Sequence, residues 1–286
     1  MRKFKFSYMG AVTLMLSFGL FVSCQNEGTE TVPIEPDQIS EATKAKFAEL
    51  GFDVSDIKMT DELELLDPAQ EAGNYLLEGD IVITPENLEA MLQSEVAHVG
   101  AVGEQYRTTN LVGGLPRTIT VIGYTGGSLA LTSKMRTALQ WAINNYNALN
   151  TGLTFTLAFG TNWQAFDMVV YKPSGGAGGS AGFPSGGDPF QFIQIFSGTN
   201  SFSTNVNEHV ITHEIGHALG LRHTDYFNRS LSCGTGGNEG SAGVGAILIP
   251  GTPSGFDANS VMLACFSSSE DGEFGPFDRV ALEFLY

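Results

Sequence analysis

The sequence predicts an α+β fold, in which a twisted mixed sheet is backed by a long helix and a second helix carries a metal site. Three observations lead to this prediction. Strand and helix periodicities follow one another as strand, helix, strand, strand between residues 117 and 171. Three of the five histidines lie within residues 213–223. A small acidic stretch precedes this part of the chain and is too short to build a large core.

The first residues have the pattern of an export signal. Three basic residues and no acid stand before an apolar run at 9–22, which is too short to span a bilayer. Residues 1–23 are therefore predicted to be a signal peptide. Residues 20–24 resemble a bacterial lipobox, although Phe21 stands where leucine is usual, and cleavage there would leave Cys24 as a lipidated N-terminus. The expected location is outside the bacterial cytoplasm, either lipid-anchored at the outer membrane or cell surface, or plainly secreted.

Charge divides the rest of the chain. Residues 24–106 hold 19 acidic and three basic side chains, whereas residues 107–286 hold 12 acidic and eight basic ones. The stretch 24–38 is predicted to be a solvated tether, and 39–106, called here the front segment, a small acidic unit that leans on the part behind it. No basic patch indicates nucleic acid, and membrane contact is expected only through a lipidated N-terminus.

The front segment contains three predicted elements. Residues 39–50 have the pattern of a short amphipathic helix that begins near Ser40. Residues 74–83 form a strand-like run broken by Gly79, and residues 84–86 are a good helix start because proline stands at the first helical position.

The part from 107 onward, called here the zinc-bearing part, begins with a strand at 117–124. Thr132 or Ser133 then caps a long helix, and strands follow at 153–159 and 166–171. The glycine-rich run 174–187 is either a flexible surface loop or the rim of a site.

Three further elements complete this part. Residues 190–196 form another strand, and residues 205–219 form a helix for which Asn205 and Glu208 resemble a capping box. Pro276 opens a terminal helix. The apolar face predicted for that helix consists of Phe277, Val280, Ala281 and Phe284.

The metal site is predicted from the spacing of residues 213–223. His213 and His217 are four residues apart, so a helix places both rings on one face. Glu214 lies about 100° further round, beside the metal, where its carboxylate can hold a water. Gly220 can turn the chain back in a left-handed conformation, so that His223 supplies a third nitrogen. Three histidines with one open position are typical of a catalytic Zn²⁺ site.

Two cysteines remain if Cys24 is lipidated. These are Cys233 and Cys265, and an even number of cysteines in an exported protein favours a disulfide between them. The alternative is two free thiols.

These residues resemble the metzincin clan of zinc endopeptidases. Its long histidine motif matches residues 213–223, and Ser260-Val261-Met262 is similar to its Met-turn, in which Met262 would lie beneath the metal. The His-Glu-Ile-Gly-His wording is most similar to the bacterial dual-action HEIGH metallo-peptidases. The resemblance implies a metzincin-like catalytic domain at 107–286, with backing helix, active-site helix, Met-turn and C-terminal helix.

The implied activity is hydrolysis of protein or peptide bonds by a zinc-bound water, with Glu214 as general base. The clan binds its substrate along an edge strand, and residues 190–196 occupy that place in chain order. Activation is expected to follow a cut near Arg107 or Arg117. Calcium occurs in this clan, but no carboxylates here have the spacing of a calcium loop. The tyrosine that astacins place after the Met-turn is absent.

The front segment resembles a propeptide. Residues 76–81 are similar to the Phe-x-Gly-Asp motif of astacin propeptides, with Leu77 in place of phenylalanine. The resemblance implies that Asp80 fills the open metal position and keeps a precursor latent. The alternative is a Gly-Asp turn at a strand bend.

Two other functions stay open at this point. The fold could carry a non-catalytic zinc-bearing surface adhesin, or a hydrolase that acts on a non-peptide amide. The presence of Glu214 argues against the adhesin, because a binding module has no need of that carboxylate.

Overall fold

The computed structural model describes residues 39–50, 52–60, 66, 73–93, 105–237, 246–252 and 255–286. The predicted signal peptide (1–23), Cys24 and the tether (24–38) lie outside the described residues. Among the helices of the described ranges, none is long and apolar enough to cross a membrane.

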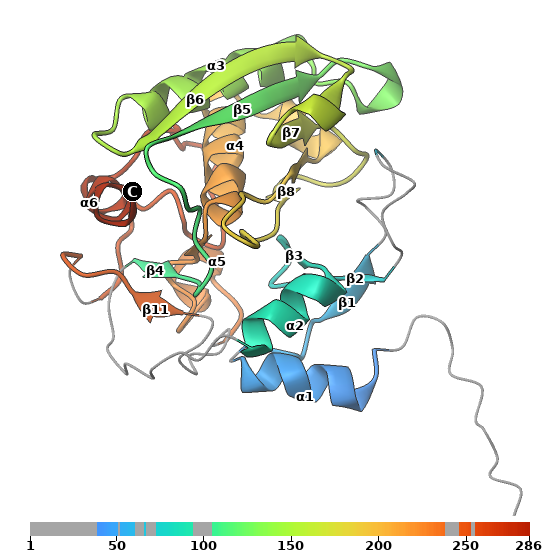
Figure 1. Cartoon of the computed structure of the whole chain (residues 1–286), viewed down its shortest axis with the longest axis vertical. Helices are drawn as coiled ribbons and strands as arrows, with labels where there is room; N and C mark the ends of the chain where they lie inside the picture. The colour runs from blue at the N-terminus through green and yellow to red at the C-terminus, as the bar shows by residue number, and fades with distance from the viewer. Residues whose placement is uncertain are drawn as a thin grey trace, which may run out of the picture. The chain divides into compact units, whose positions relative to one another are not determined.

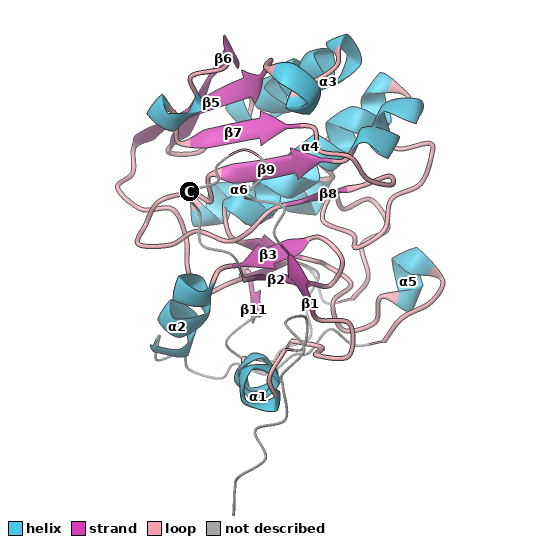
Figure 2. Ribbon diagram, turned by 90° about the vertical axis from the view of Figure 1, so that its right-hand side faces the viewer, coloured by secondary structure: helices cyan, strands magenta, loops and turns pink. Residues whose placement is uncertain are grey.

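The main sheet has five strands in the order β6-β5-β7-β9-β8, which follow one another from top to bottom in Figure 2. All neighbours are parallel except β8, which runs antiparallel to β9, so the sheet is mixed as predicted. The strands β7 and β9 are buried along their whole length, as is typical of parallel strands covered on both faces. The strands are β5 Arg117–Tyr124, β6 Leu153–Gly160, β7 Met168–Tyr171, β8 Gly179–Ser180 and β9 Phe192–Ile195.

The predicted backing helix is α3 (Ser133–Asn147), which packs against β6 and α4 (Figure 1). Thr132 caps it, because its hydroxyl accepts a hydrogen bond from the Met135 N–H. Tyr146 joins it to α4 by donating from its hydroxyl to the Thr212 carbonyl at 2.9 Å. Short 3₁₀ turns at Gly127–Leu129, Trp163–Ala165 and Ser197–Ser201 link the neighbouring elements.

The metal-site helix is α4 (Thr204–Ala218), and it is buried over nearly all its length. It begins one residue earlier than predicted, because the hydroxyl of Ser203 caps it by accepting a hydrogen bond from the Val206 N–H. The predicted capping box of Asn205 and Glu208 is therefore wrong. The Glu208 carboxylate instead accepts a hydrogen bond from the Asn145 amide, because it points toward α3 rather than back along its own helix.

A second, three-stranded sheet places β4 (Tyr106–Arg107) between β10 (Leu221–Arg222) and β11 (Ile247–Leu248). Gln105, just before β4, is buried and donates to both Ser260 and Asp278. Arg107 thus lies in a central strand, which does not suit the expected activation cut.

Arg117 suits that cut no better. It begins β5 and its guanidinium donates to Asp188 at 2.8 Å and to Asp167 at 3.3 Å. Cutting at either arginine would sever paired strands.

The terminal helix α6 (Pro276–Leu285) buries Ala281 as predicted, but the rest of its buried face differs from the predicted one. Its buried residues are Asp278, Ala281 and Leu282, whereas Phe284 is 56% exposed and Val280 is 38% exposed. The reason is the Asp278 carboxylate, whose several hydrogen bonds to the interior fix the rotation of the helix. A short helix α5 (Ser230–Cys233) precedes β11.

The front segment folds into two helices around a three-stranded antiparallel sheet. Its elements are α1 (Glu41–Glu49), β1 (Lys58–Thr60), β2 (Asn74–Leu77), β3 (Ile81–Ile83) and α2 (Pro85–Gln93). Its own apolar cluster incorporates Phe183 of the zinc-bearing part. As predicted, Ser40 caps the first helix and the segment leans on the part behind it.

The contact between the two parts is an extension of the main sheet. The Val82 N–H donates to the Ala181 carbonyl at 2.6 Å, and the Ala181 N–H donates to the Asp80 carbonyl at 2.9 Å. The pairing is parallel. The glycine-rich run 174–187 therefore contributes the edge β8, and the strand predicted at 190–196 is an inner strand, which corrects its assignment as the edge.

Candidate metal centre

Three histidines from α4 and the turn after it converge on one point. His217 Nε2 lies 3.0 Å from His213 Nε2 and 3.2 Å from His223 Nε2. The first two rings come from adjacent turns of α4, as their spacing of four residues predicts. All three side chains are buried.

The third ring depends on a glycine turn. The helix ends at Leu219, and Gly220 takes a φ of +105°, a left-handed conformation that favours glycine. A Cβ at this position would lie 2.6 Å from the Asn110 carbonyl oxygen. The chain therefore reverses into β10 and brings His223 back toward α4.

Backbone carbonyls fix the orientation of two rings. His213 Nδ1 lies 2.9 Å from the Val261 carbonyl and His217 Nδ1 lies 2.8 Å from the Leu221 carbonyl. A carbonyl only accepts, so Nδ1 carries the proton and the Nε2 lone pairs face each other. Such an arrangement is repulsive by itself and is suited to a shared cation.

The distances fit Zn²⁺. Zinc–nitrogen bonds of about 2.0–2.1 Å in a tetrahedron place the ligand nitrogens about 3.3 Å apart, close to the two Nε2 separations. Burial, together with the charges of the other two histidines, holds the pKa of His217 well below its usual value, which keeps this ring neutral as a ligand must be.

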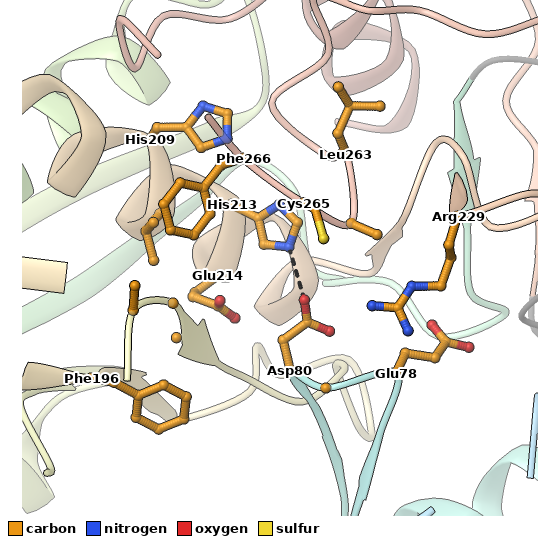
Figure 3. A pocket seen from close by; sticks show the side chains of 16 residues that line it. Glu78, Asp80, Phe196, His209, His213, Glu214, Arg229, Leu263, Cys265 and Phe266 are labelled. Atoms are coloured by element: carbon orange, nitrogen blue, oxygen red, sulfur yellow. Dashed lines mark ion pairs between the residues drawn. The ribbon is translucent and has the colours of Figure 1, made fainter. Parts of the chain in front are cut away.

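Asp80 completes a group of four candidate ligands with the three histidines. Its Oδ2 lies 3.1 Å from His223 Nε2 and 3.6 Å from His213 Nε2, the ion pair drawn in Figure 3. Asp80 lies at the end of the turn between β2 and β3, in which Glu78 has a φ of +59° and Gly79 has a φ of +96°. A type I′ turn needs a positive φ at both of its central residues. Glycine at position 79 suits this turn, and Glu78 suits it less well.

Glu214 lies beside this group, not within it. Its carboxylate points into the same cavity as Asp80 (Figure 3), and Oε2 has no hydrogen-bond partner among the described residues. A Cβ at Gly179 would lie 2.7 Å from Glu214 Oε1, so β8 needs glycine there. Burial and the nearby Asp80 charge raise the pKa of Glu214 well above its usual value. For Asp80, burial acts in the same direction, but the histidines outweigh it and lower its pKa.

Met262 lies beneath α4. A Cβ at Gly216 would approach Met262 Sδ to 2.5 Å, so the glycine of His-Glu-Ile-Gly-His makes room for that sulfur. The chain around Met262 is held by Asp278, whose carboxylate accepts from the Val261 N–H at 2.9 Å and the Ser260 hydroxyl at 2.7 Å.

Asp278 and Gly216 support the site and were not predicted from the sequence. A signal for Asp278 was present, since it occupies the third position of a helix opened by Pro276, and its carboxylate accepts from the Gly275 N–H at that helix start. Nothing in the sequence indicated that both oxygens of this carboxylate would also accept hydrogen bonds from the turn around Met262.

A cavity of about 250 Å³ opens beside the histidines. Among its lining residues are Asp80, Glu214, Phe196, His209, Arg229 and Phe266. His209 also lines this cavity, and burial with the charge of His213 lowers its pKa to about 4. The lining segment 263–266 is fixed by a disulfide between Cys233 and Cys265, the first of the two alternatives for these cysteines.

A family model described as dual-action HEIGH metallo-peptidase matches residues 75–286. A search of the curated proteins found no match. Two solved structures of myroilysin are similar at 15% and 16% sequence identity, each with a TM-score of 0.40; they cover 62% and 72% of this chain and 82% and 98% of theirs.

Proposed function

Because the chain belongs to the dual-action HEIGH metallo-peptidase family, we propose that it is a zinc-dependent endopeptidase of the metzincin type. Its substrates would be proteins or peptides. The observation that carries this proposal is the convergence of three Nε2 atoms next to the buried carboxylate of Glu214.

His213, His217 and His223 would hold one zinc ion, which supplies a Lewis acid for the scissile carbonyl and the attacking water. The carbonyls of Val261 and Leu221 keep two of these rings in the required tautomer. Glu214 would take the proton of the attacking water and pass it to the departing amine. Met262, packed against Gly216, would support the ligand helix from below, as in the Met-turn of metzincins.

The front segment is proposed to keep the full chain latent. Asp80 lies where a fourth ligand would bind, and Val82 pairs with Ala181 at the edge to which an extended peptide would add. A substrate cannot occupy this edge while β3 is there.

Activation would then require a cut that spares the second sheet. Tyr106 of β4 pairs within the second sheet and Gln105 donates to Asp278, although both residues fall in the front segment as defined from the sequence. The helix α2 ends earlier, at Gln93. We place the cut between Gln93 and Gln105.

The location outside the cytoplasm is proposed from the sequence alone. If Cys24 is lipidated, a Cys24→Ser variant should lose incorporation of labelled fatty acid and leave the membrane fraction. Labelling that persists in this variant would exclude Cys24 as the anchor.

Catalysis by Glu214 is tested with Glu214→Gln in the full chain, carrying a site-specific protease sequence between Gln93 and Gln105. After the cut, the variant should hydrolyse a denatured protein about 10³-fold more slowly than the parent, since general-base catalysis contributes about 10²–10⁴-fold. Glu208→Gln, on the same helix but away from the histidines, is the matched control. Parent protein that carries one zinc ion and cleaves nothing would favour the non-catalytic adhesin.

A further inference from the structure

A buried ion pair lies directly beside the metal centre. Glu78 of the front segment has a side chain that is 1% exposed, and Arg222, which precedes the ligand His223, is 0% exposed. The Arg222 Nη2 group donates to Glu78 Oε1. Glu78 Oε2 lies 3.6 Å from His223 Nδ1, so the same carboxylate also reaches the third ring.

A second guanidinium faces this carboxylate. Figure 3 shows the Arg229 side chain pointing toward Glu78, and both residues line the cavity that contains Glu214 and Asp80. The Glu78 carboxylate is thus held in the same cavity as the catalytic carboxylate. Two arginines around one carboxylate form the arrangement that proteins use to recognise an acidic group.

The partners of Arg222 come from both parts of the chain. Its guanidinium lies 4.5 Å from the ring centre of Phe52, in the front segment, and 6.0 Å from that of Tyr226, in the zinc-bearing part. If the front segment leaves, Arg222 loses its carboxylate and Phe52 together. The guanidinium face that Phe52 and Glu78 cover would then be open to an acidic group of another peptide.

The position of Glu78 relative to Asp80 indicates where that partner would come from. Asp80 contacts the histidines, and Glu78 is two residues away, in the turn just before the stretch 80–82 that pairs with the sheet edge at Ala181. A peptide bound along the same edge would bring side chains near its scissile bond to the two arginines.

We propose that Arg222 and Arg229 form a carboxylate-binding subsite of the active enzyme. It selects peptides with Asp or Glu within about two residues of the scissile bond, and Glu78 occupies it in the uncut chain. This inference rests on the proposed peptidase function and names the substrate class.

The test uses the full chain cut at the inserted site between Gln93 and Gln105. Matched peptides differ only by Glu or Gln at one position on either side of the cleaved bond. The parent should cleave the preferred Glu peptide with a kcat/KM about tenfold or more above that of its Gln partner, because a hydrogen bond to a charged group contributes about that factor. Arg229→Met and Arg222→Met should reduce this ratio toward one, while Arg136→Met on α3 should leave it unchanged.

Metal analysis and the Gln peptides show whether a variant has lost its zinc or its general activity instead of the preference for an acidic group. Arg229→Met should keep its zinc, and its kcat/KM should fall much more on the Glu peptides than on the Gln peptides, since the acidic group loses its partner. A second set of peptides ends beside the cut in a free carboxylate or an amide. A preference for the free carboxylate would assign the subsite to chain ends and not to acidic side chains.

Binding supplies a readout that needs no turnover. A labelled peptide of residues 74–83 should bind the cut protein about tenfold more tightly than its Glu78→Gln version, and Arg229→Met should remove the difference. Equal cleavage of Glu and Gln peptides by the parent would overturn the subsite and leave the peptidase proposal intact. No cleavage of any peptide by zinc-loaded protein, with the binding difference present, would overturn the peptidase and retain the subsite.

Discussion

The two sides of the metal centre are built differently. On the histidine side, the ligands come from one buried helix and the turn that ends it, and backbone carbonyls orient two of the rings. On the opposite side, Asp80 and Glu78 arrive on a hairpin of the front segment, whose α1 and α2 pack mainly around a separate apolar cluster.

The two sides differ in which of their contacts can remain when the front segment leaves. The histidine side is continuous with the main core, so it can persist when the front segment is absent. The front segment meets the metal centre through charged groups and a short strand pairing, which water or a peptide can replace. The chain thus combines a stable metal site with a front segment that can leave it.

Metal removal is expected to give the largest effect on the histidine side. Chelation should abolish hydrolysis and lower the Tm by about 5–10 °C, since a ligand at about 100 times its Kd adds about 2.7 kcal/mol. Calorimetry with and without a chelator measures the shift. His217→Ala should match the chelated parent, and a variant Tm that still falls on chelation would place the metal elsewhere.

Removal of the Asp80 carboxylate of the front segment should have a smaller effect and should raise activity instead of lowering it. Asp80→Ala in the uncut full chain should raise basal hydrolysis about tenfold or more, because a carboxylate is a competent fourth zinc ligand. Initial rates on a quenched peptide measure this. Asp56→Ala, an exposed residue of the same segment, is the control, and unchanged latency in Asp80→Ala would remove the latch.

The histidine side could be predicted from the sequence because its geometry is local. His213 and His217 obey the helical period, and Gly220 has a conformation that glycine favours, so spacing alone determines where the rings meet. The same holds for Thr132, whose capping role follows from the first turn of its own helix.

The contacts of the front segment with the metal site, and the side chains that support this site, could not be predicted in the same way. They depend on segments that are distant in the sequence. The edge strand β8 is only two residues long and has no apolar pattern, since Gly179 is required by the closeness of Glu214. Arg222 and Glu78 are separated by 144 residues, and neither has a local signal that names the other. The predicted face of α6 failed because Asp278, a polar residue, is the one that points inward.

That inward carboxylate also ties the histidine side to the C-terminal helix. Asp278 accepts hydrogen bonds from Gln105, Ser260 and the Val261 N–H, and the Val261 carbonyl in turn orients His213. Asp278→Asn replaces one acceptor oxygen by a donor group, so at least one of these buried donors loses its partner.

We expect Asp278→Asn to lower the free energy of unfolding by about 2–3 kcal/mol, which corresponds to a Tm decrease of about 4–10 °C. Thermal unfolding monitored by circular dichroism checks this, with the exposed Asp271→Asn as the matched control. Because the site would be loosened and not removed, the variant should still bind zinc, with lower affinity than the parent. A variant with parental stability would show that the turn around Met262 holds its position without this carboxylate, and the permanent side of the site would then depend on α4 alone.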